Sequence, residues 1–204
     1  MKIKRRTQEE RSSATREALT TAARRLWGVR GYADVGTPEI AQAAGVTRGA
    51  MYHQFADKSA LFLAVVEAVE QDVMNRLAAA VASSPAATPA DALRVAVDEW
   101  LQIADDPEVR QLILLDAPSV LGWDGFRDVA QRYSLGMTEQ LLSDAMRAGQ
   151  LARQPVRPLA HILIGALDEA AMVIATADDQ KRAHREVRQV LRRLLDAMLI
   201  DAGN

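Results

Sequence analysis

The sequence contains no cysteine, only nine aromatic residues among 204, and only three histidines. The absence of cysteine excludes disulfides, thiolate nucleophiles and thiolate metal ligands. No HExxH pattern, glycine-rich phosphate loop or nucleophile elbow occurs, and the histidines lie far apart without metal-ligand spacing. We therefore expect a protein without catalytic residues, metal or cofactor.

Long uninterrupted apolar runs are also absent. The most apolar run, residues 159–176, is broken by His161, Asp168 and Glu169. The basic N-terminus lacks the apolar stretch of a signal peptide. These features predict a cytoplasmic protein with no membrane partner.

The net charge of −2 is unevenly distributed along the chain. Residues 1–55 contain ten Lys/Arg and five Asp/Glu, which gives +5, whereas residues 56–204 contain fifteen and twenty-two, which gives −7. A basic head on an acidic body is expected when only the head contacts nucleic acid. Residues 1–11 are predicted to form a flexible basic arm. This arm either contacts phosphates or the minor groove of DNA, or is a solvated tail without a partner.

Apolar residues recur at helical spacing throughout the chain, and the seven prolines fall at expected helix starts or in connections. This pattern predicts an all-α fold of about nine helices in two domains, residues 1–56 and 57–204. The expected helices cover residues 12–29, 37–44, 47–55, 57–82, 88–104, 106–115, 124–148, 159–176 and 179–200.

Residues 37–58, TPEIAQAAGVTRGAMYHQFADK, have the spacing of a helix-turn-helix. Thr37 with Pro38 is predicted to cap a first helix, Gly45 to end it, and Thr47 to cap a second helix. In a helix-turn-helix the second helix enters the DNA major groove. An ordinary helical hairpin is the alternative.

The second helix carries side chains suited to DNA. Arg48 can reach a guanine edge or a phosphate, and Gly49 lets the backbone approach the duplex closely. Tyr52, His53 and Lys58 can donate to phosphates. The full candidate DNA-binding set is Thr37, Thr47, Arg48, Gly49, Ala50, Tyr52, His53 and Lys58.

This segment resembles the amino-terminal DNA-binding domain of the TetR family of bacterial transcriptional regulators. The resemblance covers the first quarter to third of the chain and is carried by Thr37, Ile40, Ala41, Ala44, Gly45, Val46, Thr47, Gly49, Tyr52, Phe55, Lys58 and Leu61. It implies an all-helical homodimer whose second domain binds a small-molecule effector.

The last two expected helices indicate a dimer. Residues 159–176 are apolar almost all round, so they need cover on every side, and a second subunit is the natural cover. A monomer whose final hairpin packs on its own domain is the alternative. The candidate interface residues are Leu159, Ile162, Gly165, Ala166, Val187, Leu191, Leu194 and Met198.

The second domain is also the expected place for an effector pocket, because it combines aromatic residues and methionines with a few polar groups. His161 and Asp168 share a helix face and are either ligand-binding groups or a pair satisfied at a buried interface. A mainly apolar lining suggests a hydrophobic or aromatic ligand, cationic if Asp116 and Asp168 contribute. The candidate pocket residues are Trp100, Asp116, Trp123, Phe126, Tyr133, Met137, Leu141, His161, Asp168 and Met172.

We interpret the sequence as a ligand-responsive transcriptional regulator, specifically a repressor that binds a palindromic DNA operator as a homodimer and is released by a small hydrophobic effector. The alternatives are a transcriptional activator, an effector-independent DNA-binding protein such as a DNA-packaging protein, and a small-molecule-transforming helical enzyme.

Overall fold

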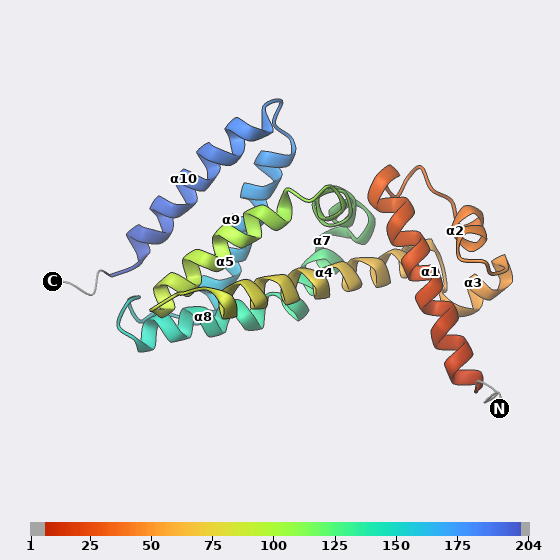
Figure 1. The fold of residues 1–204 in the computed structure, drawn as a ribbon, viewed down its shortest axis with the longest axis horizontal. Helices are drawn as coiled ribbons and strands as arrows, with labels where there is room; N and C mark the ends of the chain where they lie inside the picture. The colour runs from red at the N-terminus through yellow and green to blue at the C-terminus, as the bar shows by residue number, and fades with distance from the viewer. Residues whose placement is uncertain (1–6, 201–204) are drawn as a thin grey trace.

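The computed structural model describes residues 7–200, and these form an all-α protein (Figure 1). Within this range α6, η1 and α7 follow one another without a break, so the helices make nine continuous stretches, as the sequence predicts. A lone bridge between Leu151 and Leu199 is the β-structure of this range. The elements are α1 (Gln8–Arg30), α2 (Thr37–Ala43), α3 (Arg48–Gln54), α4 (Lys58–Ser83), α5 (Pro89–Ala104), α6 (Pro107–Val109), the π-helix η1 (Arg110–Asp116), α7 (Ala117–Tyr133), α8 (Leu135–Arg147), α9 (Val156–Ala175) and α10 (Gln180–Met198).

Helices α1, α2 and α3 form one end of the molecule (Figure 1). Helix α1 begins at Gln8, four residues earlier than predicted, because Thr7 and Glu10 form a reciprocal capping box. Arg11 therefore belongs to a helix rather than to the predicted arm, and the rest of that basic run, residues 1–6, lies outside the described residues.

Helix α4 connects this end to the rest of the protein (Figure 1). Its first turns bury Leu61 and Phe62 in the core of the helix-turn-helix, where Phe62 meets Trp27 edge to face at 5.4 Å. Its later turns bury Val73 and Leu77. One apolar cluster thus runs from α1 along α4 into the helices that follow. The division into two domains between residues 56 and 57 remains a prediction.

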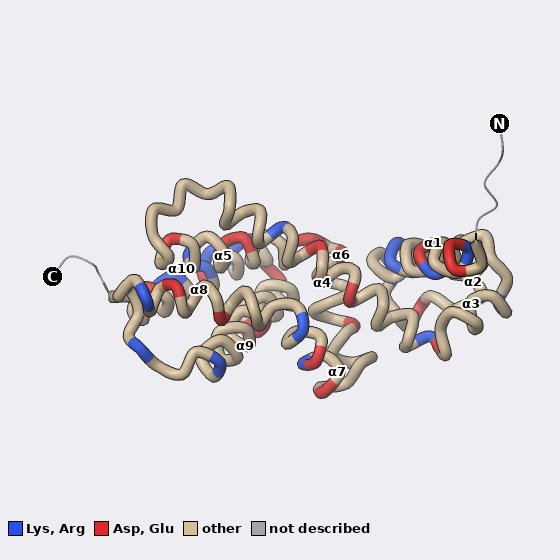
Figure 2. Tube along the Cα trace, turned by 90° about the horizontal axis from the view of Figure 1, so that it is seen from below, with Lys and Arg blue, Asp and Glu red and all other residues tan. Residues whose placement is uncertain are grey.

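A second apolar cluster joins α5, α8, α9 and α10. Charge pairs fasten α10 along α5, where basic positions on one helix lie beside acidic positions on the other (Figure 2). Arg188 and Arg192 both reach Asp98, and Arg94 reaches Asp196 at 2.9 Å. Part of the basic surface of α10 is therefore neutralised within the subunit.

The segment from residue 107 to 148 differs from prediction in two places. The sequence predicts breaks at Pro118 and Gly122. Pro118 lies in continuous helix, whereas the chain does turn at Gly122, whose φ of +70° a residue with a side chain adopts only at a cost. The single helix expected over residues 124–148 is divided at Ser134. The Ser134 hydroxyl donates to the Ala130 carbonyl at 2.7 Å, a local bond that bends helices.

Candidate DNA-binding face and effector pocket

The turn between α2 and α3 has the predicted local chemistry. Gly45 takes φ +68°, and the Thr47 hydroxyl accepts a hydrogen bond from the Ala50 backbone N–H at 3.1 Å. The predicted role of Thr37 as a cap is wrong, because Gly36 occupies that position and makes no side-chain cap bond. Thr37 is instead the buried first residue of α2.

Helix α3 presents a polar face to solvent. Arg48, Gly49, Tyr52 and His53 are exposed, whereas Met51 on the opposite side is fully buried. The Arg48 guanidinium lies over the Tyr52 ring, 5.6 Å from its centroid. The Tyr52 hydroxyl is 3.3 Å from the Thr37 hydroxyl. Hydrogen bonds with Thr37 and then Arg48 lower the pKa of the Tyr52 phenol.

Helix α1 holds α3 in place from behind. Arg16 donates to the Gln54 carbonyl at 3.1 Å, and its guanidinium lies 4.2 Å from the centroid of Phe55. Ser12 and the Gln54 side chain are also hydrogen bonded, at 2.9 Å. These contacts fix the direction in which α3 projects from the molecule.

Lys58 is occupied within the subunit. Its ammonium donates to the Tyr32 carbonyl at 2.6 Å and lies 4.0 Å from the centroid of the Tyr32 ring. Burial lowers the pKa of this ammonium. The bond to Tyr32 ties the start of α4 to the segment that follows α1, and the ammonium has two further N–H donors.

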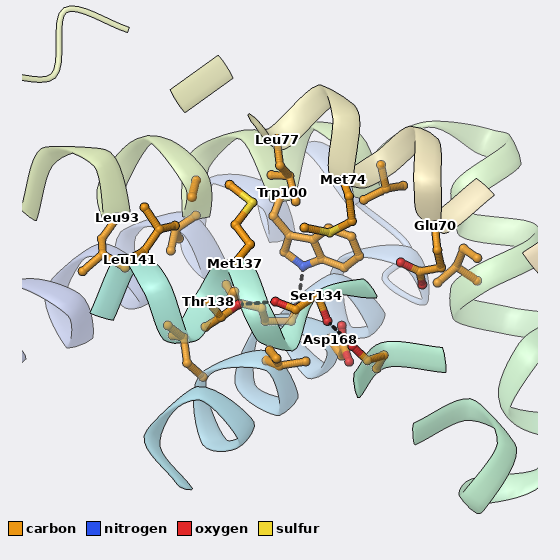
Figure 3. A pocket seen from close by; sticks show the side chains of 18 of the residues that line it. Glu70, Met74, Leu77, Leu93, Trp100, Ser134, Met137, Thr138, Leu141 and Asp168 are labelled. Carbon is orange, nitrogen blue, oxygen red and sulfur yellow. Dashed lines mark hydrogen bonds between the residues drawn. The ribbon is translucent and has the colours of Figure 1, made fainter. Parts of the chain in front are cut away.

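A mainly apolar cavity lies between α4, α5, α7, α8 and α9 (Figure 3). The space that water-sized molecules can occupy is about 80 Å³, within about 770 Å³ of space between atoms that includes open solvent. Five of the ten predicted residues line it, namely Trp100, Phe126, Met137, Leu141 and Asp168. Trp100 is held in position by donating from its indole nitrogen to the Leu167 carbonyl at 3.2 Å.

Two carboxylates occupy one end of this cavity. Glu70 from α4 and Asp168 from α9 lie at the end opposite Leu93 and Leu141 (Figure 3). Burial, and then the charge of Asp168, raise the pKa of Glu70 to about 7. Burial raises the pKa of Asp168 to about 6. Sequence reasoning missed Glu70, although its place between Val66 and Val73 on the apolar face of α4 was a usable signal.

The other predicted pocket residues lie elsewhere. Asp116 accepts from the Tyr32 backbone N–H at 2.8 Å, at the contact with the helix-turn-helix. Tyr133 and Met172 pack at the edge of the first apolar cluster. Trp123 and His161 line an outer groove between α7 and α9, and Trp123 is 67% exposed. The groove shares Phe126, Ala130, Ile164 and Asp168 with the cavity.

Within residues 7–200, helices α9 and α10 leave an apolar face uncovered. By length and composition alone α9 would suffice to cross a membrane, and 22% of its apolar window is buried. Exposed large residues on the two helices include the predicted Ile162 and Leu194 and the unpredicted Val173 and Val190. Gly165 and Ala166 are exposed, and nothing lies within 4 Å of a Cβ placed on Gly165.

The assignment of Leu191 to this face is wrong. Leu191 is 8% exposed and packs in the second apolar cluster of its own subunit. Leu159, Val187 and Met198 are partly buried against the same cluster. A helix that packs on two partners has a wide apolar stripe, and its sequence does not tell which half faces inward.

The segment α6–η1 joins the cavity to the helix-turn-helix. Ile113 of η1 lines the cavity, while Asp116 at its end binds Tyr32. Arg24 of α1 forms a bidentate ion pair with Glu108 of α6. Its Nη2 and Nε atoms donate to the two carboxylate oxygens at 2.7 and 3.0 Å. A π-helical turn is a frequent feature of functional sites, and this one contacts both the cavity and α1.

Two family models match this chain. One is described as bacterial regulatory proteins, tetR family, and matches residues 19–65. The other is described as tetracyclin repressor-like, C-terminal domain, and matches residues 90–198, more than half of the chain.

Individual relatives agree with these matches. A TetR-family transcriptional regulator from Pectobacterium atrosepticum has 32% identity and a TM-score of 0.83, over 96% of this chain and 99% of that one. The HTH-type transcriptional regulator AcrR of Shigella flexneri has 42% identity over 69 residues, which is 34% of this chain and 32% of AcrR. The structure of RolR in complex with resorcinol shares the fold at 21% identity, with a TM-score of 0.73 over 92% of this chain and 90% of RolR.

Proposed function

Because the chain belongs to the TetR family of bacterial regulatory proteins, we propose that it is a ligand-responsive repressor. It binds a palindromic operator as a homodimer, and a small molecule in the α4–α9 cavity releases it. The observation that carries the proposal is the exposed polar face of α3, held rigidly by α1, on a protein that also contains an apolar cavity.

In this proposal α3 enters the major groove with Arg48 as the base-reading residue. Arginine recognises a guanine edge through two parallel donors. Tyr52, His53 and Lys58 bind phosphates, with Thr37 supporting the Tyr52 hydroxyl. A dimer presents two copies of α3 to successive grooves, so the operator is expected to be a near-palindrome.

The effector acts through the α6–η1 segment. A ligand against Ile113 shifts η1, and the Asp116–Tyr32 and Glu108–Arg24 contacts transmit the shift to α1. The effector changes DNA affinity only to the extent that it binds the two arrangements differently. RolR, of the same fold, was solved with resorcinol bound, which supports a small-molecule site in this chain.

The experiment that tests the function is selection of bound duplexes from a random DNA pool. A repressor dimer should enrich one palindrome, which can then be used to screen compounds for release. A DNA-packaging protein or an enzyme would enrich none.

Arg48→Ala should weaken binding to the selected operator by about 1–3 kcal/mol and relax base preference at one position in each half-site. Competition binding and a repeated selection would measure both. Arg153→Ala, an exposed arginine in the α8–α9 connection, is the matched control and should change neither. An unaltered selected sequence for Arg48→Ala would contradict base readout.

Asp116→Ala should reduce the response to any effector found in that screen while leaving the selected operator unchanged. The substitution removes the acceptor for the Tyr32 N–H and so uncouples η1 from the helix-turn-helix. Asp116→Asn keeps an acceptor oxygen and is the control. An unchanged ratio of operator affinities with and without effector would show that the signal travels by another contact.

A further inference from the structure

The cavity contains acidic groups that the protein itself leaves unpaired. Among residues 7–200, neither Glu70 nor Asp168 has an ion-pair partner or a hydrogen-bond donor. The fully enclosed side-chain polar atoms of this range are all hydrogen bonded, so these unbonded oxygens keep some surface accessible to water. A buried carboxylate without a partner is costly, and a neighbour of like charge adds to the cost.

The surroundings do not relieve this charge. The ionisable groups on the elements packed around the pair include Arg24 on α1, Glu67 on α4, Glu99 on α5, Asp116 on η1, Arg127, Arg132 and Tyr133 on α7, Glu139 on α8, and His161 and Glu169 on α9. Arg132 binds Glu67 at 2.6 Å, and Arg24 binds Asp72 and Glu108. Arg127 shares the outer groove with Asp168, but its guanidinium lies 5.7 Å from the centroid of the Trp123 ring and forms no ion pair with either carboxylate among residues 7–200.

The rest of the lining is apolar and suited to a hydrocarbon body. Met74, Leu77, Trp100, Met137 and Leu141 extend from the acidic end to the far end (Figure 3). The hydroxyls of Ser134 and Thr138 donate their protons to backbone carbonyls. They are therefore not donors to the carboxylates.

We propose that the effector is a small apolar cation, an amine or quaternary ammonium, whose charge lies between Glu70 and Asp168 and whose hydrocarbon part lies against Trp100 and Met137. This inference rests on the proposed function, which assigns the effector to this cavity. A ligand cation supplies the missing counter-charge, and the indole of Trp100 offers apolar contact area to the hydrocarbon part. A divalent metal ion is a poorer occupant, because it prefers six or more oxygen ligands. No group of three acidic or histidine side chains in residues 7–200 is arranged to hold one.

The test compares two probes of the same shape on the full-length protein. 3-(Hydroxymethyl)phenyltrimethylammonium carries a permanent charge, and 3-tert-butylbenzyl alcohol is its neutral counterpart. Calorimetry at pH 8 should show the cation binding at least about ten-fold more tightly. The preference should decrease at pH 5, where protons occupy the carboxylates. Since neither the ammonium nor the alcohol titrates between pH 5 and 8, the change must come from the protein.

Glu70→Gln and Asp168→Asn should each lower affinity for the cation about ten-fold and leave the neutral probe bound as well or better. Glu67→Gln is the matched control, one turn earlier on α4 and paired outward with Arg132. Circular dichroism verifies that each variant is folded. Equal affinity for both probes at pH 8, or cation binding that neither variant reduces, overturns the inference.

The operator assay separates this inference from the proposed function. If neutral compounds occupy the cavity and release the operator, the repressor function stands and the cation inference fails. If the cation binds as expected but no cavity ligand alters DNA binding, the site stands and effector-controlled release fails.

Discussion

Leu194→Glu should convert the protein from a dimer to a monomer and lower its affinity for a palindromic operator about 100-fold or more, because two linked heads bind far more tightly than one. Leu194 is 56% exposed on α10, beside Val190, which is equally exposed. A charge at this position would need to be desolvated in any interface that covers the face. Light scattering gives the mass, and a gel-shift titration gives the operator affinity.

Gln189→Glu is the matched control for this variant. It changes the charge by the same amount on an exposed residue of the same helix, about a quarter turn away from the apolar face. It should preserve both mass and affinity. Leu191→Glu is unsuitable as a test, because Leu191 belongs to the core of its own subunit and its replacement would unfold the domain. A Leu194→Glu protein of unaltered dimer mass would move the interface elsewhere.

The elements that sequence reasoning located well are those whose signals are local. The sequence predicts caps at Thr47 and at Asp57, the first residue of the helix expected over residues 57–82. Both are present, and their side chains accept hydrogen bonds from the Ala50 and Ala60 backbone N–H groups. A cap depends on a side chain and a backbone donor three residues away, so no tertiary information is needed. The helix-turn-helix follows from these two caps and from Gly45.

The residues that sequence reasoning misplaced depend on how helices are rotated and kinked in the fold. Trp123 was expected in the cavity, but the chain turns at Gly122 and leaves the indole in an outer groove. A stripe of apolar residues gives the face of a helix but not the identity of its neighbour.

Glu70 lines the cavity but is missing from the predicted pocket residues. A carboxylate inside an apolar stripe is easily passed over as a solvated residue, yet the spacing from Val66 to Glu70 to Val73 places all three on one face. What the sequence could not supply is the second carboxylate. Asp168 lies almost a hundred residues later and meets Glu70 only because α9 packs across the cavity from α4.

Glu70→Gln should stabilise the empty protein at pH 8 by about 3 kcal/mol and raise its Tm by roughly 6–10 °C. The pKa of Glu70 is about 7 in the folded protein against 4.5 in the unfolded chain. The folded state therefore binds more protons between these values, and stability falls as the pH rises from about 4.5 through 7. Glutamine has no charge to desolvate, so the variant escapes this loss.

The gain should depend on pH in a defined direction. At pH 5 the carboxyl of folded Glu70 is protonated, so the advantage of glutamine should shrink to about 1 kcal/mol or less. Asp168→Asn should behave in the same sense with a transition nearer pH 6. Glu67→Gln removes only a partly exposed pair with Arg132, and should cost about 0–1 kcal/mol. Thermal unfolding at fixed protein concentration, followed by circular dichroism from pH 5 to 8, measures these differences.

A stability gain confined to high pH would mean that the wild-type protein carries Glu70 at a cost to its fold. Selection retains such a group where function needs it, since substitutions that relieve strained or desolvated sites commonly stabilise proteins and weaken their activity. A Glu70→Gln protein of unchanged stability at pH 8 would instead mean that the carboxylate has a counter-charge or water already. The acidic end of the cavity would then carry no uncompensated charge for a cationic ligand to neutralise.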